Sequence, residues 1–268
     1  MEQKIVLITG ISSGIGEATA HALALAGHRV FGTARAPEKL TPIPGVELIR
    51  MDVQDDESVR DGVDLVLRKA GRIDVIVNNA GVSLVGPVEA SSDAEAMSVF
   101  DTNVFGVLRV VRAVLPAMRR EQQGLIINLS SVLGFLPAPF MGIYAASKHA
   151  LEGLSESLDH EVRDFGVRVV LVEPSFTKTK LDTNATRTAQ NIESYSAALG
   201  RSINAVQQQV SSAPAAAEVA QEILSILGST HRLRRPADGR AKLLRFLRRF
   251  APPGMVDKSL RGAFGLQS

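Results

Sequence analysis

The chain has 268 residues, of which 45% are apolar, and its formal net charge at pH 7 is +2. This is enough apolar material for one large α/β domain, and so small a net charge does not indicate a nucleic-acid partner. No run of 18 uncharged apolar residues suggests a membrane span, and the lack of cysteine excludes disulfides and thiolate metal sites. The first residues lack the pattern of a secretory signal, so we expect a cytoplasmic protein.

Short β-branched runs alternate with longer segments of helical spacing. The runs are apolar throughout, as in a parallel sheet covered on both faces, and their β-α-β order predicts a Rossmann-like doubly wound sheet of about seven strands with helices on both faces. The predicted strands are 4–9, 29–33, 46–51, 74–78, 125–129 and 167–172, with a seventh near Leu233, and the predicted helices are 15–26, 55–70, 93–121, 144–165 and 215–228.

No linker interrupts this alternation, so we expect a single dinucleotide-binding catalytic domain over 1–268. The segment 178–213 is rich in Ala, Ser, Gln and Asn and follows the sixth strand. At the carboxyl edge of the sheet it would lie over the ligand crevice as a substrate lid. Residues 231–268 form a basic C-terminal extension.

The first predicted strand ends in a glycine-rich turn that leads into a helix. The turn spaces Gly10, Gly14 and Gly16 as Gly-x-x-x-Gly-x-Gly. Glycines let main-chain N–H groups approach a pyrophosphate closely, and the amino terminus of the next helix adds partial positive charge. The strand-turn-helix context favours a dinucleotide site over an ordinary glycine-rich turn.

Tyr144 and Lys148 stand four residues apart, and Ser131 ends an apolar run thirteen residues before Tyr144. Positions i and i+4 share one face of a helix, so the ammonium can lie beside the phenol. A neighbouring positive charge lowers the pKa of a tyrosine from about 10 toward the range in which general acid–base catalysis is efficient. The pattern predicts a proton-transfer site, although a Tyr-x-x-x-Lys alone also fits a surface pair.

Residues 4–230 resemble the short-chain dehydrogenase/reductase family in its single-domain branch. The resemblance implies a nicotinamide cofactor that carries a hydride while the protein supplies orientation and electrostatics. It rests on the turn 9–16, on Asn78-Asn79-Ala80-Gly81, on Asn103, on Ser130-Ser131, and on Tyr144 with Lys148.

This resemblance implies four catalytic residues. Tyr144 would exchange a proton with the substrate oxygen, Lys148 would lower the pKa of Tyr144 and hold the nicotinamide ribose, and Ser131 would hydrogen-bond the substrate oxygen. Asn103 would hold a water that relays protons to Lys148. The cofactor-binding residues implied are Gly10, Ser12, Ser13, Gly14, Ile15, Gly16, Arg35, Asp52, Val53, Asn79, Ala80, Gly81, Tyr144, Lys148, Pro174, Thr177 and Thr179.

In one place the chain departs from the family pattern. The family has Pro-Gly-x-x-x-Thr after the sixth strand, and here Ser175 replaces that glycine while Thr179 stays in register. No metal site is predicted, because neither His149 nor His160 has a second ligand at metal spacing.

The end of the second strand bears on the choice of cofactor. NAD enzymes place an acidic residue there for the ribose 2′-hydroxyl, whereas an arginine suits a 2′-phosphate. This chain reads Gly32-Thr33-Ala34-Arg35 without an acid. We therefore expect NADP(H), with Arg35 pairing to the phosphate, over the alternative of Arg35 as a solvated loop charge.

The segment 132–141, between Ser131 and Tyr144, carries no charge. An apolar wall beside the reacting centre favours a lipophilic ketone or alcohol, although these side chains could equally pack the core beneath the site. The chain beyond 230 is longer than in the family's acyl-carrier ketoreductases and is more similar to hydroxysteroid- and retinol-type dehydrogenases.

Residues 232–249 hold eight Lys or Arg and a single Asp, a net charge of +7. Leu243, Phe246, Leu247 and Phe250 follow helical spacing. One interpretation is a short amphipathic helix that touches an anionic membrane. We favour the other, a terminal helix packed on the domain or on a partner with its arginines in water.

The leading functional hypothesis is an NADP(H)-dependent oxidoreductase that interconverts a ketone and a secondary alcohol. The alternative is a catalytically silent NADP(H)-binding sensor or scaffold, and a third hypothesis is another reaction on the same scaffold, such as epimerisation or dehydration. The resemblance also implies a homodimer or homotetramer, because the helices that carry Asn103 and Tyr144 commonly pair between subunits.

Overall fold

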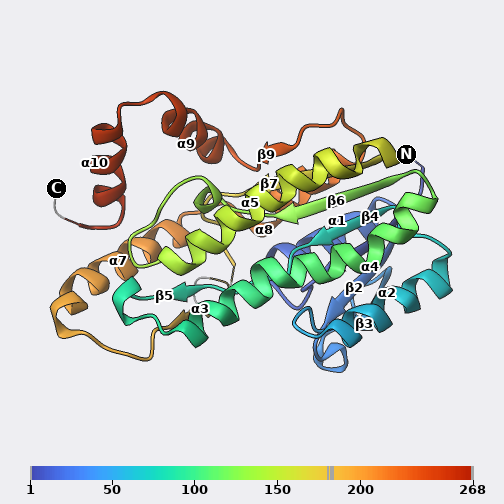
Figure 1. The fold of residues 1–268 in the computed structure, drawn as a ribbon, viewed down its shortest axis with the longest axis horizontal. Helices are drawn as coiled ribbons and strands as arrows, with labels where there is room; N and C mark the ends of the chain where they lie inside the picture. Colours follow the sequence, from blue (N-terminus) through green and yellow to red (C-terminus); the bar gives the residue numbers. More distant parts are fainter. Residues whose placement is uncertain (1, 180, 182–183, 267–268) are drawn as a thin grey trace.

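A seven-stranded parallel sheet forms the centre of the computed structural model, which describes residues 2–179, 181 and 184–266 (Figure 1). The strand order is β3-β2-β1-β4-β6-β7-β9, which confirms the predicted doubly wound sheet and the seventh strand near Leu233. The strands are β1 (Ile5–Thr9), β2 (Arg29–Ala34), β3 (Val46–Arg50), β4 (Val75–Asn78), β6 (Gly124–Leu129), β7 (Val167–Glu173) and β9 (Arg234–Pro236).

Helices cover both faces of this sheet. On one face, α1 (Gly14–Leu25) and α8 (Ala216–Ile226) lie side by side and bury Leu23 and Ile223 against the strands. On the other face lie α2 (Asp56–Ala70), α4 (Gly106–Arg120) and α5 (Gly142–Val162).

Strand β1 shows why the predicted runs are apolar throughout. Val6 and Ile8 face the α1–α8 layer, whereas Leu7 between them faces the layer of α2, α4 and α5. Successive side chains of a strand point to opposite faces, so a strand buried on both faces needs an apolar residue at every position. All three of these side chains are fully buried.

Buried polar side chains fix α5 against the sheet. The Asn78 amide donates to Asn128 Oδ1 (2.8 Å), and the Asn128 amide donates to Ser155 Oγ on α5 (2.8 Å). Near the end of the helix, Asp159 accepts hydrogen bonds from the Val169 N–H (2.9 Å) and from two arginines. Because such groups are costly to bury without partners, these bonds hold α5 in one position along the strands.

The predicted helix 93–121 consists of three parts. α3 (Asp93–Phe100) is followed by a single π-helical turn at Asp101–Phe105 and then by α4. Arg109 braces the turn through Asp101 (2.7 Å) and also donates to the Val53 main-chain oxygen (3.2 Å). Such π-turns inside helices are frequent at functional sites, and this one carries Asn103.

The segments expected to be a lid and a basic extension contain more regular structure than the sequence indicated. Within 178–213, β8 (Thr186–Arg187) pairs with β5 (Leu84–Val85), and α7 (Glu193–Ser211) follows. The extension forms β9, α9 (Gly239–Phe250) and α10 (Pro253–Ala263).

Replacing Gly16 by alanine should destabilise the protein by about 2 kcal/mol, in the range of overpacked cores. A Cβ at this position would lie 2.3 Å from the Asn79 side-chain nitrogen and 2.4 Å from the Gly10 oxygen. Urea unfolding measures the change. Gly200→Ala is the matched control, because an added Cβ on α7 meets nothing within 4 Å and should be neutral or stabilising. Equal stability of the two variants would contradict the crowding at Gly16.

Candidate active site

A cleft of about 760 Å³ opens at the carboxyl ends of the strands. The sheet order reverses between β1 and β4, and this is where doubly wound sheets bind ligands. Two of the predicted site residues, Gly16 and Asn103, do not line this cleft. The predicted residues that line the cleft are Gly10, Ser12, Ser13, Gly14, Ile15, Arg35, Asp52, Val53, Asn79, Ala80, Gly81, Ser131, Tyr144, Lys148, Pro174, Thr177 and Thr179.

The glycine turn is held against the end of β4. The Asn79 side-chain amide donates to the Thr9 oxygen (2.9 Å) and to the Gly10 oxygen (2.8 Å), and the Asn79 N–H donates to Thr9 Oγ1 (3.0 Å). Gly10 has a left-handed backbone (φ 71°), and a Cβ there would lie 2.8 Å from the Ala80 Cα. Glycine is therefore required where the chain turns.

The start of α1 suits a phosphate group. Ser13 immediately precedes the helix, yet its side chain makes no capping hydrogen bond. Helix-terminal N–H groups without a side-chain cap, together with the helix dipole, favour an anion. Thr179 faces this turn, since a Cβ on Gly14 would lie 3.2 Å from the Thr179 Cβ. The residues present therefore fit a dinucleotide, whose pyrophosphate the turn and the start of α1 would hold.

Lys148 is a buried cation at the centre of the site. Its ammonium donates to the Leu129 main-chain oxygen at the end of β6 (2.7 Å) and lies 5.8 Å from the centroid of the Tyr144 ring. Both side chains are buried on α5. Burial lowers the pKa of Lys148 to about 8, so the charge beside Tyr144 is still present at neutral pH.

The Ser131 hydroxyl is oriented by the main chain. Its Oγ accepts a hydrogen bond from the Leu133 N–H (3.1 Å), which leaves the hydroxyl hydrogen for another acceptor. Ser131 lines the same cleft as Tyr144 and Lys148. The structure thus brings together three of the four predicted catalytic residues.

Asn103 lies behind the cleft wall. Its side chain accepts from the Val82 N–H (2.9 Å) and donates to the Val82 oxygen (3.0 Å) and to Ser147 Oγ (3.0 Å). Because both amide donors are used, a bound water would meet only Oδ1 or the main-chain carbonyl. The assignment of a water to Asn103 stays a prediction, and what the side chain visibly does is join Val82 to α5.

Lys39 is a cleft residue that the sequence analysis missed. It stands four residues after Arg35, and both exposed side chains line the cleft beyond the end of β2. Ala34, the last residue of β2, is buried, so no carboxylate occupies the position that an NAD-type acid would take. Arg35 and Lys39 therefore both lie at this end of the cleft. Lys39 could have been found in the sequence as a second positive charge close to Arg35.

Apolar side chains enclose the other end of the cleft. Leu133, Met141 and Phe176 line it and belong to one apolar cluster with Tyr144. Phe140 in the same loop adopts a left-handed backbone (φ 61°), which is strained for an aromatic residue. The segment 132–141 therefore packs against the core and also faces the cleft, and the lipophilic substrate stays a prediction.

Ser175, which replaces the family glycine, is accommodated without strain. Phe140 and Gln122 are the non-glycine residues with positive φ in the described part of the chain, so Ser175 does not need a glycine backbone. Its N–H donates to Asp238 Oδ2 (3.0 Å), while Asp238 Oδ1 caps α9 through the Ala241 N–H (2.8 Å). Asp238 was not predicted, because 63 residues separate it from Ser175.

The C-terminal extension is anchored beside this segment. Arg245 on α9 bonds to Glu173, a fully buried carboxylate at the end of β7 (3.0 Å). The expectation that the arginines of this helix lie in water is therefore wrong for Arg245. Arg234 bonds to Glu173 as well (3.1 Å) and also to Glu152.

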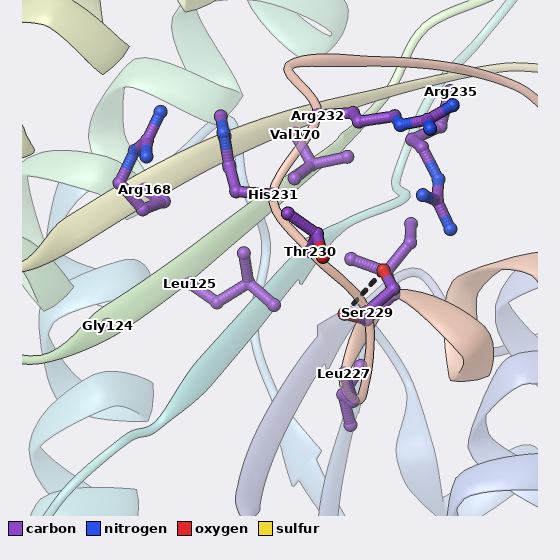
Figure 2. A pocket seen from close by; sticks show the side chains of 11 residues that line it. Gly124, Leu125, Arg168, Val170, Leu227, Ser229, Thr230, His231, Arg232 and Arg235 are labelled. Atoms are coloured by element: carbon purple, nitrogen blue, oxygen red, sulfur yellow. Dashed lines mark hydrogen bonds between the residues drawn. The ribbon is translucent and has the colours of Figure 1, made fainter.

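A smaller hollow of about 200 Å³ lies near the amino ends of β6 and β7, away from Tyr144. Figure 2 shows Arg168, His231 and Arg235 among its lining side chains. Arg168 is bonded to Asp159, and Arg235 to Glu222 and to Ser225. Because these two arginines already have protein partners, the hollow is best explained as part of the packing of β7 against the α8–β9 connection.

The fold and the cleft define a dinucleotide-binding oxidoreductase. The chain matches the family model described as short chain dehydrogenase over residues 4–190. It is 40% identical over 212 residues to a 3-ketodihydrosphingosine reductase of Bacteroides thetaiotaomicron, which covers 78% of each chain. The protein therefore belongs to the short-chain dehydrogenase family.

Further relatives are similar over different lengths. Human retinol dehydrogenase 8 is 42% identical over 191 residues, which cover 67% of this chain and 60% of that longer protein. A short-chain dehydrogenase structure from Streptomyces avermitilis covers 97% of both chains with a TM-score of 0.82 and 35% identity.

Related structures contain either nicotinamide cofactor. One from Burkholderia phymatum in complex with NAD has a TM-score of 0.79 and 30% identity, and covers 91% of this chain and 92% of that one. A metagenomic oxidoreductase in complex with NADP has a TM-score of 0.61 and 37% identity, and covers 64% of this chain and 82% of that one. Both nucleotides are thus found on this fold.

Replacing Lys148 by methionine should change how stability depends on pH. The pKa of Lys148 is about 8 in the folded protein and about 10.4 in an unfolded chain. The unfolded state binds more protons between these values, so the wild-type free energy of unfolding should rise across this window, by up to about 3 kcal/mol relative to Lys148→Met.

Urea unfolding at a series of pH values tests this prediction. Lys258→Met removes an exposed lysine of α10 and should leave the pH profile of the wild type unchanged. Parallel profiles for wild type and Lys148→Met would mean that the Lys148 ammonium is solvated rather than buried.

Proposed function

We propose that the protein is an NADP(H)-dependent oxidoreductase that interconverts a lipophilic ketone and its secondary alcohol. One observation carries the proposal: Ser131, Tyr144 and the buried Lys148 meet in one cleft that also contains the dinucleotide turn. A sensor that only bound the nucleotide would not need these three groups around a common point.

Each polar side chain has a role in that reaction. The Ser131 hydroxyl donates to the substrate carbonyl oxygen, since its oxygen already accepts from the Leu133 N–H. Tyr144 donates its proton to the same oxygen during reduction, and the Lys148 ammonium stabilises the phenolate that remains. In the oxidation direction Tyr144 takes the proton back. The bound nicotinamide supplies the hydride.

The apolar end of the cleft supports a lipophilic substrate. Leu133, Met141 and Phe176 face the space beside Tyr144. Two relatives are named for 3-ketodihydrosphingosine and for retinol, which are both lipophilic molecules with an oxygen that changes between carbonyl and hydroxyl. The apolar lining of the cleft and the names of these two relatives both support a lipophilic substrate.

We also propose a homodimer or homotetramer that pairs α4 and α5 between subunits. Phe105, directly before α4, is 48% exposed. An exposed aromatic side chain on that surface is what a subunit contact would cover.

Tyr144→Phe should lower kcat for carbonyl reduction by about 10³-fold, in the range of general acid–base catalysis, while the Kd for NADPH changes little. NADPH consumption with a panel of ketones, together with nucleotide titration, measures both. The matched control is Tyr195→Phe, which removes the hydroxyl of the chain's other tyrosine, on α7. Tight NADPH binding without turnover of any carbonyl would favour the sensor hypothesis.

The double variant Ala34→Asp with Arg35→Ala should shift preference from NADPH toward NADH. Loss of a charge-assisted bond to the 2′-phosphate should lower kcat/KM for NADPH by about tenfold to hundredfold, and the new carboxylate can bind a ribose 2′-hydroxyl. Steady-state kinetics with both cofactors check this. Lys39→Ala alone should weaken the binding of NADPH but not that of NADH. An unchanged cofactor preference in the double variant would refute the assignment of Arg35 to the 2′-phosphate.

A further inference from the structure

The hairpin of α9 and α10 lies at one end of the molecule, apart from the helices that flank the sheet (Figure 1). Its inner side is packed. Ala241 is fully buried, and Leu244, Leu260 and Phe264 join the apolar cluster that contains Tyr144. The inner side of the hairpin therefore packs on the apolar cluster beside the cleft.

The outer side of α9 exposes a stripe of large apolar side chains. Leu243, Phe246 and Phe250 are 55%, 59% and 64% exposed, and their spacing places them on one face of the helix. The Phe246 and Phe250 rings are 4.9 Å apart. Met255, at the start of α10, is 60% exposed. A contiguous exposed apolar stripe marks an interaction surface more often than scattered single residues do.

Cations without carboxylate partners accompany this stripe. Lys242, Arg248 and Arg249 are exposed, and among the described residues no carboxylate forms an ion pair with any of them. This contrasts with Arg245 of the same helix, which is paired with Glu173. In helical projection, Lys242 and Arg249 lie next to Phe246. Arg248 lies on the face of the buried Ala241, so Lys242 and Arg249 are the cations placed beside the stripe.

The apolar stripe and its neighbouring cations fit a second copy of this chain poorly. An isologous contact would bring the same cations of two subunits together, which is repulsive. The apolar stripe also offers few side chains compared with a stable interface of about 800 Å² on each partner. A surface with an apolar layer beneath negative charges would bind both the apolar stripe and the cations beside it.

We propose that the α9–α10 hairpin binds the surface of a bilayer that contains anionic phospholipid. Leu243, Phe246 and Phe250 enter the boundary between headgroups and acyl chains, and Lys242 and Arg249 contact phosphates. In the described ranges, no helix has the length and hydropathy to cross a membrane. The binding does not depend on the chemistry proposed for Tyr144.

Sedimentation of the full chain with vesicles tests this proposal. Vesicles of phosphatidylcholine with about 30 mol% phosphatidylglycerol should bind the protein, pure phosphatidylcholine should not, and about 0.5 M salt should weaken binding. Phe246→Ser with Phe250→Ser, and separately Lys242→Glu with Arg249→Glu, should each weaken binding by about tenfold or more.

Matched controls change the same kinds of residue elsewhere. Leu25→Ser alters a side chain that is 85% exposed on α1, and Arg60→Glu with Arg68→Glu reverses two exposed charges on α2. Both should bind as the wild type does. Circular dichroism melting should show that every variant folds, independently of any enzymatic assay.

Any one of three binding results would overturn the proposal. They are failure of the wild type to bind anionic vesicles, equal binding to pure phosphatidylcholine, and equal loss in the controls. A fall in molecular mass of Phe246→Ser/Phe250→Ser in ultracentrifugation would also overturn it, because the stripe would then contact a second copy.

Discussion

The end of the cleft that contains the glycine turn depends on the hydrogen bonds of the Asn79 side chain. Its amide holds the carbonyls of Thr9 and Gly10, so the ends of β1 and β4 stay together at the point where the sheet order reverses. The close approach leaves no space for a Cβ at Gly10 or Gly16. A Cβ on Gly81, two residues after Asn79, would lie 3.9 Å from the Lys148 ammonium. The hydrogen bonds of Asn79 thus fix the glycine turn and one wall around the buried Lys148 ammonium.

The sheet and the polar centre were predictable because both follow from local patterns. A strand buried on two faces must be apolar at every position, and parallel pairing brings all carboxyl ends to one edge. Residues that follow β1, β4 and β6 were therefore expected to meet, and Gly10, Asn79 and Ser131 do line one cleft. The spacing of Tyr144 and Lys148 placed both on α5, where the structure buries them.

What escaped prediction depends on contacts between distant parts of the chain. The bond from Ser175 to Asp238 spans 63 residues, and no local pattern announces it. Periodicity identified the apolar stripe of α9 but could not tell which neighbour the helix would meet. The structure buries Ala241, partly buries Leu244 in the same apolar cluster, and leaves Phe246 exposed. The left-handed backbone at Phe140 is likewise imposed by packing rather than by residue type.

The two hydrogen bonds of Asp238 have a thermodynamic consequence. One carboxylate holds both the segment after β7, which lines the cleft, and the first turn of α9. A ligand that shifts one of these segments changes the free energy of the other, and linkage makes the effect reciprocal. Whatever factor a ligand of α9 applies to nucleotide affinity, the nucleotide applies to the affinity of that ligand. The proposed lipid-binding hairpin and the cleft therefore share one hydrogen-bonding residue, Asp238.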